Sequence, residues 1–174
     1  MEFLYLPMKA VWGEDGATFE EGLEPFLQEA AERGHHVVLR LFIDYPSKPS
    51  GLPDYLAEVV PCFSYAEHGG GCSPDYDTPE LVQAMVDLIG ALGAQYDGDP
   101  RLGVVQVGLL GFWGEWHTYL DTPIAGVELP GSAKDRVVAA FGRSFSQTQL
   151  QIRTPWPAAT GLPRFGFHDD SFAH

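Results

Sequence analysis

Six short apolar runs alternate with longer segments in which apolar residues recur every three or four positions. The runs are rich in β-branched and aromatic residues and predict strands at 2–7, 36–46, 59–65, 103–108, 149–157 and 164–170. The periodic segments predict helices from about residue 24 to Gly34, over 77–96 and over 132–145. Strands that alternate with helices predict an α/β fold in which parallel strands are joined by helical crossovers.

Two α/β architectures fit this order, an open doubly wound sheet and a closed (β/α)8 (TIM) barrel. The glycine signature of dinucleotide-binding sheets is absent after the first strand, where the sequence is LPMKAVWGEDG. Polar and aromatic residues instead follow several different strands, as the active residues of a barrel do. We therefore expect 1–174 to form one domain of the TIM-barrel type, incomplete, with about six of its eight strand units and the last two missing. Its open edges would favour self-association.

Composition narrows the class of ligand more than it narrows the fold. Twenty-four acidic and ten basic residues give a formal net charge of −14, so we expect no nucleic-acid partner and a neutral or cationic small ligand. No apolar run approaches the roughly 18 residues of a membrane span, and the N-terminus lacks the basic start of a signal peptide, which leaves the localisation open. Cys62 and Cys72 fit either a disulfide or two free thiols and match no zinc pattern, and no motif indicates a cofactor.

The stretch LLGFWGEWHTY (109–119) carries the strongest candidate for chemistry. It follows the predicted strand 103–108 and places Glu115 between Trp113 and Trp116. A carboxyl group packed against indole rings is desolvated, which raises its pKa and suits it to act as a general acid. The tryptophans are suited to stacking on a sugar ring. The alternative is a packing corner, in which two glycines make the turn and the tryptophans fill the core.

Other candidates follow the remaining strands. Arg40 lies in the middle of an apolar strand, where it either forms a structural ion pair, with Asp44 or an acid of a neighbouring strand, or orients a catalytic carboxylate. Glu115, His117, His168 and Asp169 are a chemically acceptable set for a divalent metal, although no helical pair such as HExxH supports a metal site. The complete set of expected substrate-binding residues is Arg40, Asp44, Tyr45, Trp113, Trp116, His117, Arg153, His168 and Asp169.

Three segments together resemble a family of bacterial proteins described as a domain of unknown function: VVLRLFIDYP (37–46), SPDYDTPELVQAMVDLIGALGAQYDGDPRLGVVQVGLLGFWGEWHT (73–118) and GFHDDSF (166–172). That family is similar to the retaining glycoside hydrolases of the (β/α)8 superfamily, including the barrel β-galactosidases. The resemblance implies that Arg40 and Glu115 belong to the site, with Glu115 as the general acid/base. The hydrolases usually place asparagine before that glutamate, where this chain has Gly114. Their nucleophile ends a seventh strand, for which this sequence predicts no counterpart; Asp169 or Asp170 would replace it only by departing from the family's pattern.

These features predict a glycoside hydrolase-like protein that acts on or binds a carbohydrate, with Glu115 as its proton donor. The alternative is a non-catalytic carbohydrate-binding or truncated barrel, and a metal-dependent hydrolase is the third hypothesis. Hydrolysis requires a second carboxylate that faces the same cavity as Glu115 at roughly 5 to 10 Å. An ion pair between Glu115 and Arg40 without a second acid nearby would favour binding alone.

Overall fold

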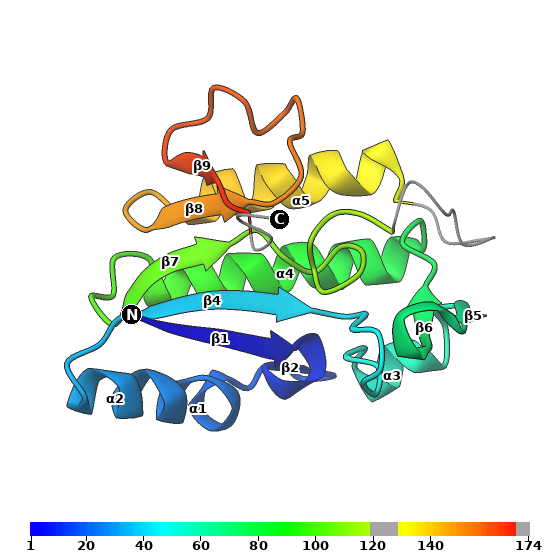
Figure 1. The fold of residues 1–174 in the computed structure, drawn as a ribbon, viewed down its shortest axis with the longest axis horizontal. Helices are drawn as coiled ribbons and strands as arrows, with labels where there is room; N and C mark the ends of the chain where they lie inside the picture. Colours follow the sequence, from blue (N-terminus) through cyan, green and yellow to red (C-terminus); the bar gives the residue numbers. More distant parts are fainter. Residues whose placement is uncertain (119–128, 170–174) are drawn as a thin grey trace.

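The core of the protein is a five-stranded parallel sheet in which each strand lies next to the strand that precedes it along the chain (Figure 1). The computed structural model describes residues 1–118 and 129–169. The strands of the sheet, in spatial order, are β1 (Glu2–Pro7), β4 (Val37–Phe42), β7 (Leu102–Gln106), β8 (Gln149–Ile152) and β9 (Phe165–Phe167). All four pairings are parallel, so the carboxyl ends of the strands meet along one edge of the sheet.

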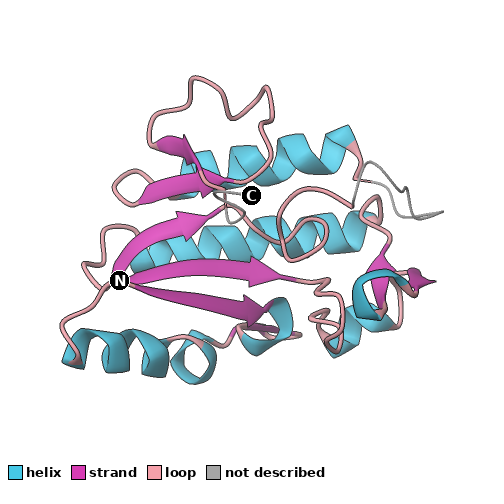
Figure 2. Ribbon diagram, in the orientation of Figure 1, coloured by secondary structure: helices cyan, strands magenta, loops and turns pink. Residues whose placement is uncertain are grey.

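Short antiparallel pairs and helices complete the fold (Figure 2). The helix predicted to begin near residue 24 does so, because a proline is tolerated in the first turn. The helices are α1 (Phe19–Gly22), α2 (Glu24–Glu32), α3 (Asp54–Ala57), α4 (Pro79–Tyr96) and α5 (Gly131–Ser144), with 3-10 turns at Met8–Ala10 and Glu67–Gly69. The small pairs are β2 (Trp12–Gly13) with β3 (Gly16–Ala17), and β5 (Cys62–Tyr65) with β6 (Gly71–Pro74).

The prediction of an incomplete TIM barrel is wrong, because the sheet is open. It runs from β1 at one edge to β9 at the other, and within the described residues these two edges do not pair. A barrel of this type closes with eight strands. The expected six strand units are also reduced to five, because the run 59–65 folds back on β6 as an antiparallel hairpin and never joins the sheet.

The two faces of the sheet have different environments. Val37, Leu39 and Leu41 of β4 belong to the main hydrophobic cluster, together with the buried residues of α4 and α5, which lie side by side along one face (Figure 2). Successive side chains of a strand point to opposite faces. Arg40 therefore lies on the opposite face from these helices, where it is nonetheless buried.

Candidate functional site

The turn that follows β7 has an unusual backbone. Leu109, Trp113 and Trp116 have positive φ angles of 72°, 55° and 65°, and Gly111 and Gly114 have 74° and 69°. Bulky residues rarely adopt this left-handed conformation, which costs about 1–3 kcal/mol each and persists only where the surrounding structure enforces it. Such strain concentrates at functional sites. The turn is held by main-chain hydrogen bonds, including 2.9 Å bonds from Phe112 N to His117 O and from Trp116 N to Leu110 O.

Gly114, directly before the candidate acid, fits only as glycine. A Cβ added there would lie 2.7 Å from the carbonyl oxygen of Leu41 and 3.2 Å from the nitrogen of Leu109. The left-handed φ of 69° adds a second penalty for any side chain. These two constraints explain physically why glycine occupies this position.

Glu115 is held by two partners, and neither is a tryptophan. Its Oε1 accepts a 2.7 Å hydrogen bond from Arg40 Nη1, and its Oε2 lies 3.0 Å from Nε2 of His117. The side chains of Arg40, Glu115 and His117 are 2%, 13% and 21% exposed, so this cluster is largely withdrawn from solvent but open at the imidazole. Within the described residues, the ion pair expected for Arg40 is formed with Glu115, in the turn that follows the neighbouring strand β7, and not with Asp44.

The guanidinium of Arg40 also contacts residues of the two neighbouring strands. Its Nε donates a 2.7 Å hydrogen bond to Gln106 Oε1, and its Cζ lies 4.5 Å from the centre of the Tyr5 ring. Gln106 is 2% exposed on β7, next to β4, and Tyr5 pairs with Arg40 in the register of β1 and β4. The sequence reasoning missed both residues. A polar Gln106 inside an apolar strand was the signal that could have identified it.

The two tryptophans of the motif lie in different environments. Trp116 is 2% exposed in the main hydrophobic cluster, where its Nε1 donates a 3.2 Å bond to the carbonyl of Gly108. Trp113 is half-buried, and its ring centre lies 6.0 Å from that of His117 and 6.3 Å from that of Tyr45. Trp113 therefore provides aromatic surface beside His117, with Tyr45 next to it, while Trp116 supports the turn from the core.

A disulfide-closed hairpin forms one side of this region. Cys62 and Cys72 are bonded across β5 and β6, which resolves the alternative that the sequence left open. Tyr65 on this hairpin donates a 2.6 Å hydrogen bond to Oδ1 of Asp44, and the His68 ring lies 5.8 Å from that of Trp113. Burial raises the pKa of Asp44 above its ordinary value, and the bond from Tyr65 opposes that rise. Sequence reasoning did not connect the hairpin with the site, because only the fold brings the two together.

The ends of β8 and β9 supply the remaining predicted residues. Arg153 Nη2 lies 3.0 Å from Asp169 Oδ1, and His168 follows β9, bonded through its main-chain nitrogen to Ile152 O at 3.2 Å. Thr154 Oγ1 donates a 2.9 Å bond to the carbonyl of Glu115, which ties the end of β8 to the turn. Asp170 lies outside the described residues. Within 1–118 and 129–169, no three His, Cys, Asp or Glu side chains are grouped so that they could hold a metal ion.

Comparison with known proteins adds no family or relative to this picture. No protein-family model matches the sequence, and a search of curated proteins also finds no match. The similarity to the bacterial family and to the hydrolases therefore stays a prediction.

Among the described helices, none has both the length and the apolar character needed to cross a membrane.

Proposed function

We propose that the chain binds a carbohydrate, or a small ligand equally rich in hydroxyl groups, at the Arg40–Glu115–His117 cluster and does not hydrolyse it. The observation that carries this proposal is the fixed position of the Glu115 carboxylate, bonded at Oε1 to Arg40 and at Oε2 to His117. An ionised carboxylate has about four lone-pair sites, so two remain to accept hydrogen bonds from ligand hydroxyls. The half-buried ring of Trp113 offers the apolar surface against which one face of a sugar packs.

The interactions of the described carboxylates in this region favour binding over hydrolysis. Glycoside hydrolysis uses two carboxyl groups that flank the bond to be broken. Of the other acids predicted for this region, the two that the structure describes have different tasks, since Asp44 is buried against Tyr65 and Asp169 is paired with Arg153. Glu115 is itself engaged in an ion pair with Arg40, which suits a fixed hydrogen-bond acceptor.

The test is to titrate the chain with a panel of soluble monosaccharides and oligosaccharides. Binding is measured by isothermal titration calorimetry and by NMR of the tryptophan indole signals. Glu115→Gln and His117→Ala remove contacts within the cluster, and Glu29→Gln is the matched control on the exposed surface of α2. Each variant is first shown to be folded by circular dichroism. His117→Ala keeps the buried Arg40–Glu115 pair, so it tests the site even if Glu115→Gln is unstable.

We expect at least one sugar to bind the wild type and to shift the Trp113 indole signal. Loss of one charge-assisted hydrogen bond, worth about 1.5–3 kcal/mol, should weaken binding tenfold or more in Glu115→Gln and leave the Glu29→Gln control unchanged. The same panel as aryl glycosides should give no turnover. Turnover that disappears in Glu115→Gln would replace the proposal with a hydrolase, and a folded wild type that binds no member of the panel would overturn it.

A further inference from the structure

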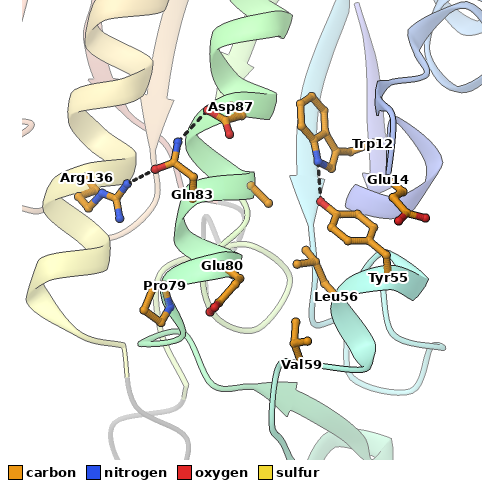
Figure 3. Close-up of a pocket in the computed structure, with 11 residues that line it drawn as sticks. Trp12, Glu14, Tyr55, Leu56, Val59, Pro79, Glu80, Gln83, Asp87 and Arg136 are labelled. Carbon is orange, nitrogen blue, oxygen red and sulfur yellow. Dashed lines mark hydrogen bonds between the residues drawn. The ribbon is translucent and has the colours of Figure 1, made fainter.

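A second feature of the surface is a groove of about 680 Å³ (Figure 3). One wall is the exposed face of α4, and the other consists of α3 and the segment that contains Trp12 and Glu14. None of the three cluster residues lines it. Its volume lies within the roughly 300–1,000 Å³ of sites that hold small organic ligands.

The α3 wall is aromatic and apolar. Trp12 Nε1 donates a 3.0 Å hydrogen bond to the hydroxyl of Tyr55, which satisfies the indole N–H and holds the two rings together (Figure 3). Val59 at the end of the same wall is 55% exposed and adds aliphatic surface to the groove. This wall therefore offers ring faces and aliphatic surface, with few polar groups left to satisfy.

The opposite side of the groove is acidic. Glu80 and Asp87 lie about two helical turns apart on the exposed face of α4, and Glu14, in the β2–β3 turn, adds a carboxylate on the side of Trp12 and Tyr55 (Figure 3). Arg136 donates a 2.7 Å bond to Gln83, whose amide donates a 2.8 Å bond to Asp87. Glu14 and Glu80 make no hydrogen bond to any other residue drawn in Figure 3. The lining thus carries three carboxylates against one guanidinium, in a protein whose formal net charge is −14.

The geometry points to a second binding site, for a small organic cation: an amine or quaternary ammonium group carried on a flat or apolar body. The cation is attracted by the Glu14 and Glu80 carboxylates and by the ring faces of Trp12 and Tyr55, since aromatic faces bind cations. The apolar body packs against Val59 and its neighbours. Anionic ligands are repelled by the same carboxylates, and a neutral analogue gains only the apolar contacts. This site is independent of the proposed carbohydrate site.

The test compares ligands of the same shape and different charge on the full chain. The cationic probes are 2-phenylethylamine, benzyltrimethylammonium and tryptamine; 2-phenylethanol and 3-phenylpropanoate are the neutral and anionic counterparts of the first. Binding is followed by two-dimensional NMR, with the indole signal of Trp12 as the reporter. Glu14→Gln and Glu80→Gln each remove one carboxylate, and Glu58→Gln is the matched control, an exposed acid beside α3 that does not line the groove.

We expect the cations to shift the Trp12 signal and the alcohol and the carboxylate to leave it nearly unchanged. Each of the two glutamine variants should weaken binding up to about fivefold, the effect of one solvent-exposed charge pair, and Glu58→Gln should bind as the wild type does. Equal binding of 2-phenylethylamine and 2-phenylethanol would overturn the proposal in favour of an unselective apolar groove. Failure of all three cations to shift Trp12 would overturn the site itself.

Discussion

Replacing Arg40 and Glu115 together by apolar residues should harm the fold far less than replacing either one alone. Arg40 is 2% exposed and Glu115 13%, so each single variant removes the opposite charge that lies 2.7 Å from a largely buried partner. Breaking a buried pair from one side typically costs about 3–5 kcal/mol, whereas replacing the whole pair with apolar residues of similar volume is often neutral. The suitable substitutions are Arg40→Met and Glu115→Leu.

The size of the effect follows from what the double variant leaves behind. Two independent losses would destabilise the protein by about 6–10 kcal/mol. In the double variant neither charge remains, and among the contacts of the described residues the main penalty is Gln106 Oε1, which is buried and loses the Arg40 donor. One unsatisfied buried acceptor costs about 1–3 kcal/mol. We therefore expect a coupling free energy of at least about 3 kcal/mol between the two positions.

Urea denaturation of the wild type, both single variants and the double variant measures this coupling, with tryptophan fluorescence and circular dichroism as probes. The pair Arg33–Glu2 is the matched control, because its atoms lie 2.8 Å apart but its side chains are 50% and 32% exposed. Exposed pairs couple by about 1 kcal/mol or less. The reasoning fails if the coupling of Arg40 with Glu115 does not exceed that of the control. A double variant that is nearly as stable as the wild type but no longer binds the sugar would separate the binding role of the pair from stability.

Three further changes test other parts of the structure. Gly114→Ala should lower the free energy of unfolding by about 2 kcal/mol or more in a urea titration, because its Cβ meets a β4 carbonyl at 2.7 Å and its φ is 69°; an unchanged midpoint would refute the clash. Replacing both Cys62 and Cys72 by serine should cost about 2.5–3 kcal/mol, the loop-closure entropy for a sequence separation of 10, and reduction of the wild type should give the same loss. Burial raises the pKa of Asp97, but main-chain N–H groups at 146–148 more than offset this and lower it to about 2 from 3.8. The lowered pKa stabilises the fold above about pH 4, and that contribution is lost as the pH falls towards 2; in acid-unfolding curves Asp97→Asn should therefore be less stable at neutral pH and show a shallower loss over this interval.

Local patterns in the sequence were sufficient to locate the strands of the sheet. They did not show which strands pair with one another. The runs at 2–7 and 103–108 became β1 and β7 within one or two residues because a buried strand needs a continuous apolar segment. The run 59–65 has a similar composition but contains Pro61, which has no N–H to donate to a central ladder. The segment instead pairs with β6 outside the sheet. Closure into a barrel depends on such pairings and was predicted wrongly.

For the candidate site, the sequence likewise predicted which segments meet but not how their side chains are oriented. The rule that parallel strands end at one edge predicts that Arg40 and Glu115 lie in the same region, and in the structure one hydrogen bond joins them. The rule does not say which way a side chain points after the strand has ended. Trp113 lies at the site and Trp116 lies in the core. The positive φ angles within 109–116 change the direction of the chain between these two residues. That information lies in the tertiary contacts of the turn, so no periodicity reveals it.

The alternative of a packing corner is weakened by what this turn costs the fold. A corner that only reversed the chain would be built from glycine and apolar side chains, without a buried ion pair and without left-handed Leu109, Trp113 and Trp116. Each of these features is unfavourable for stability when considered alone, and all of them act on the position of one carboxylate. Strain and buried charge that converge on Glu115 are accounted for if the exact placement of its oxygens matters to a ligand. The double substitution at Arg40 and Glu115 tests this argument directly, because it removes the carboxylate and relieves the buried charge in the same molecule.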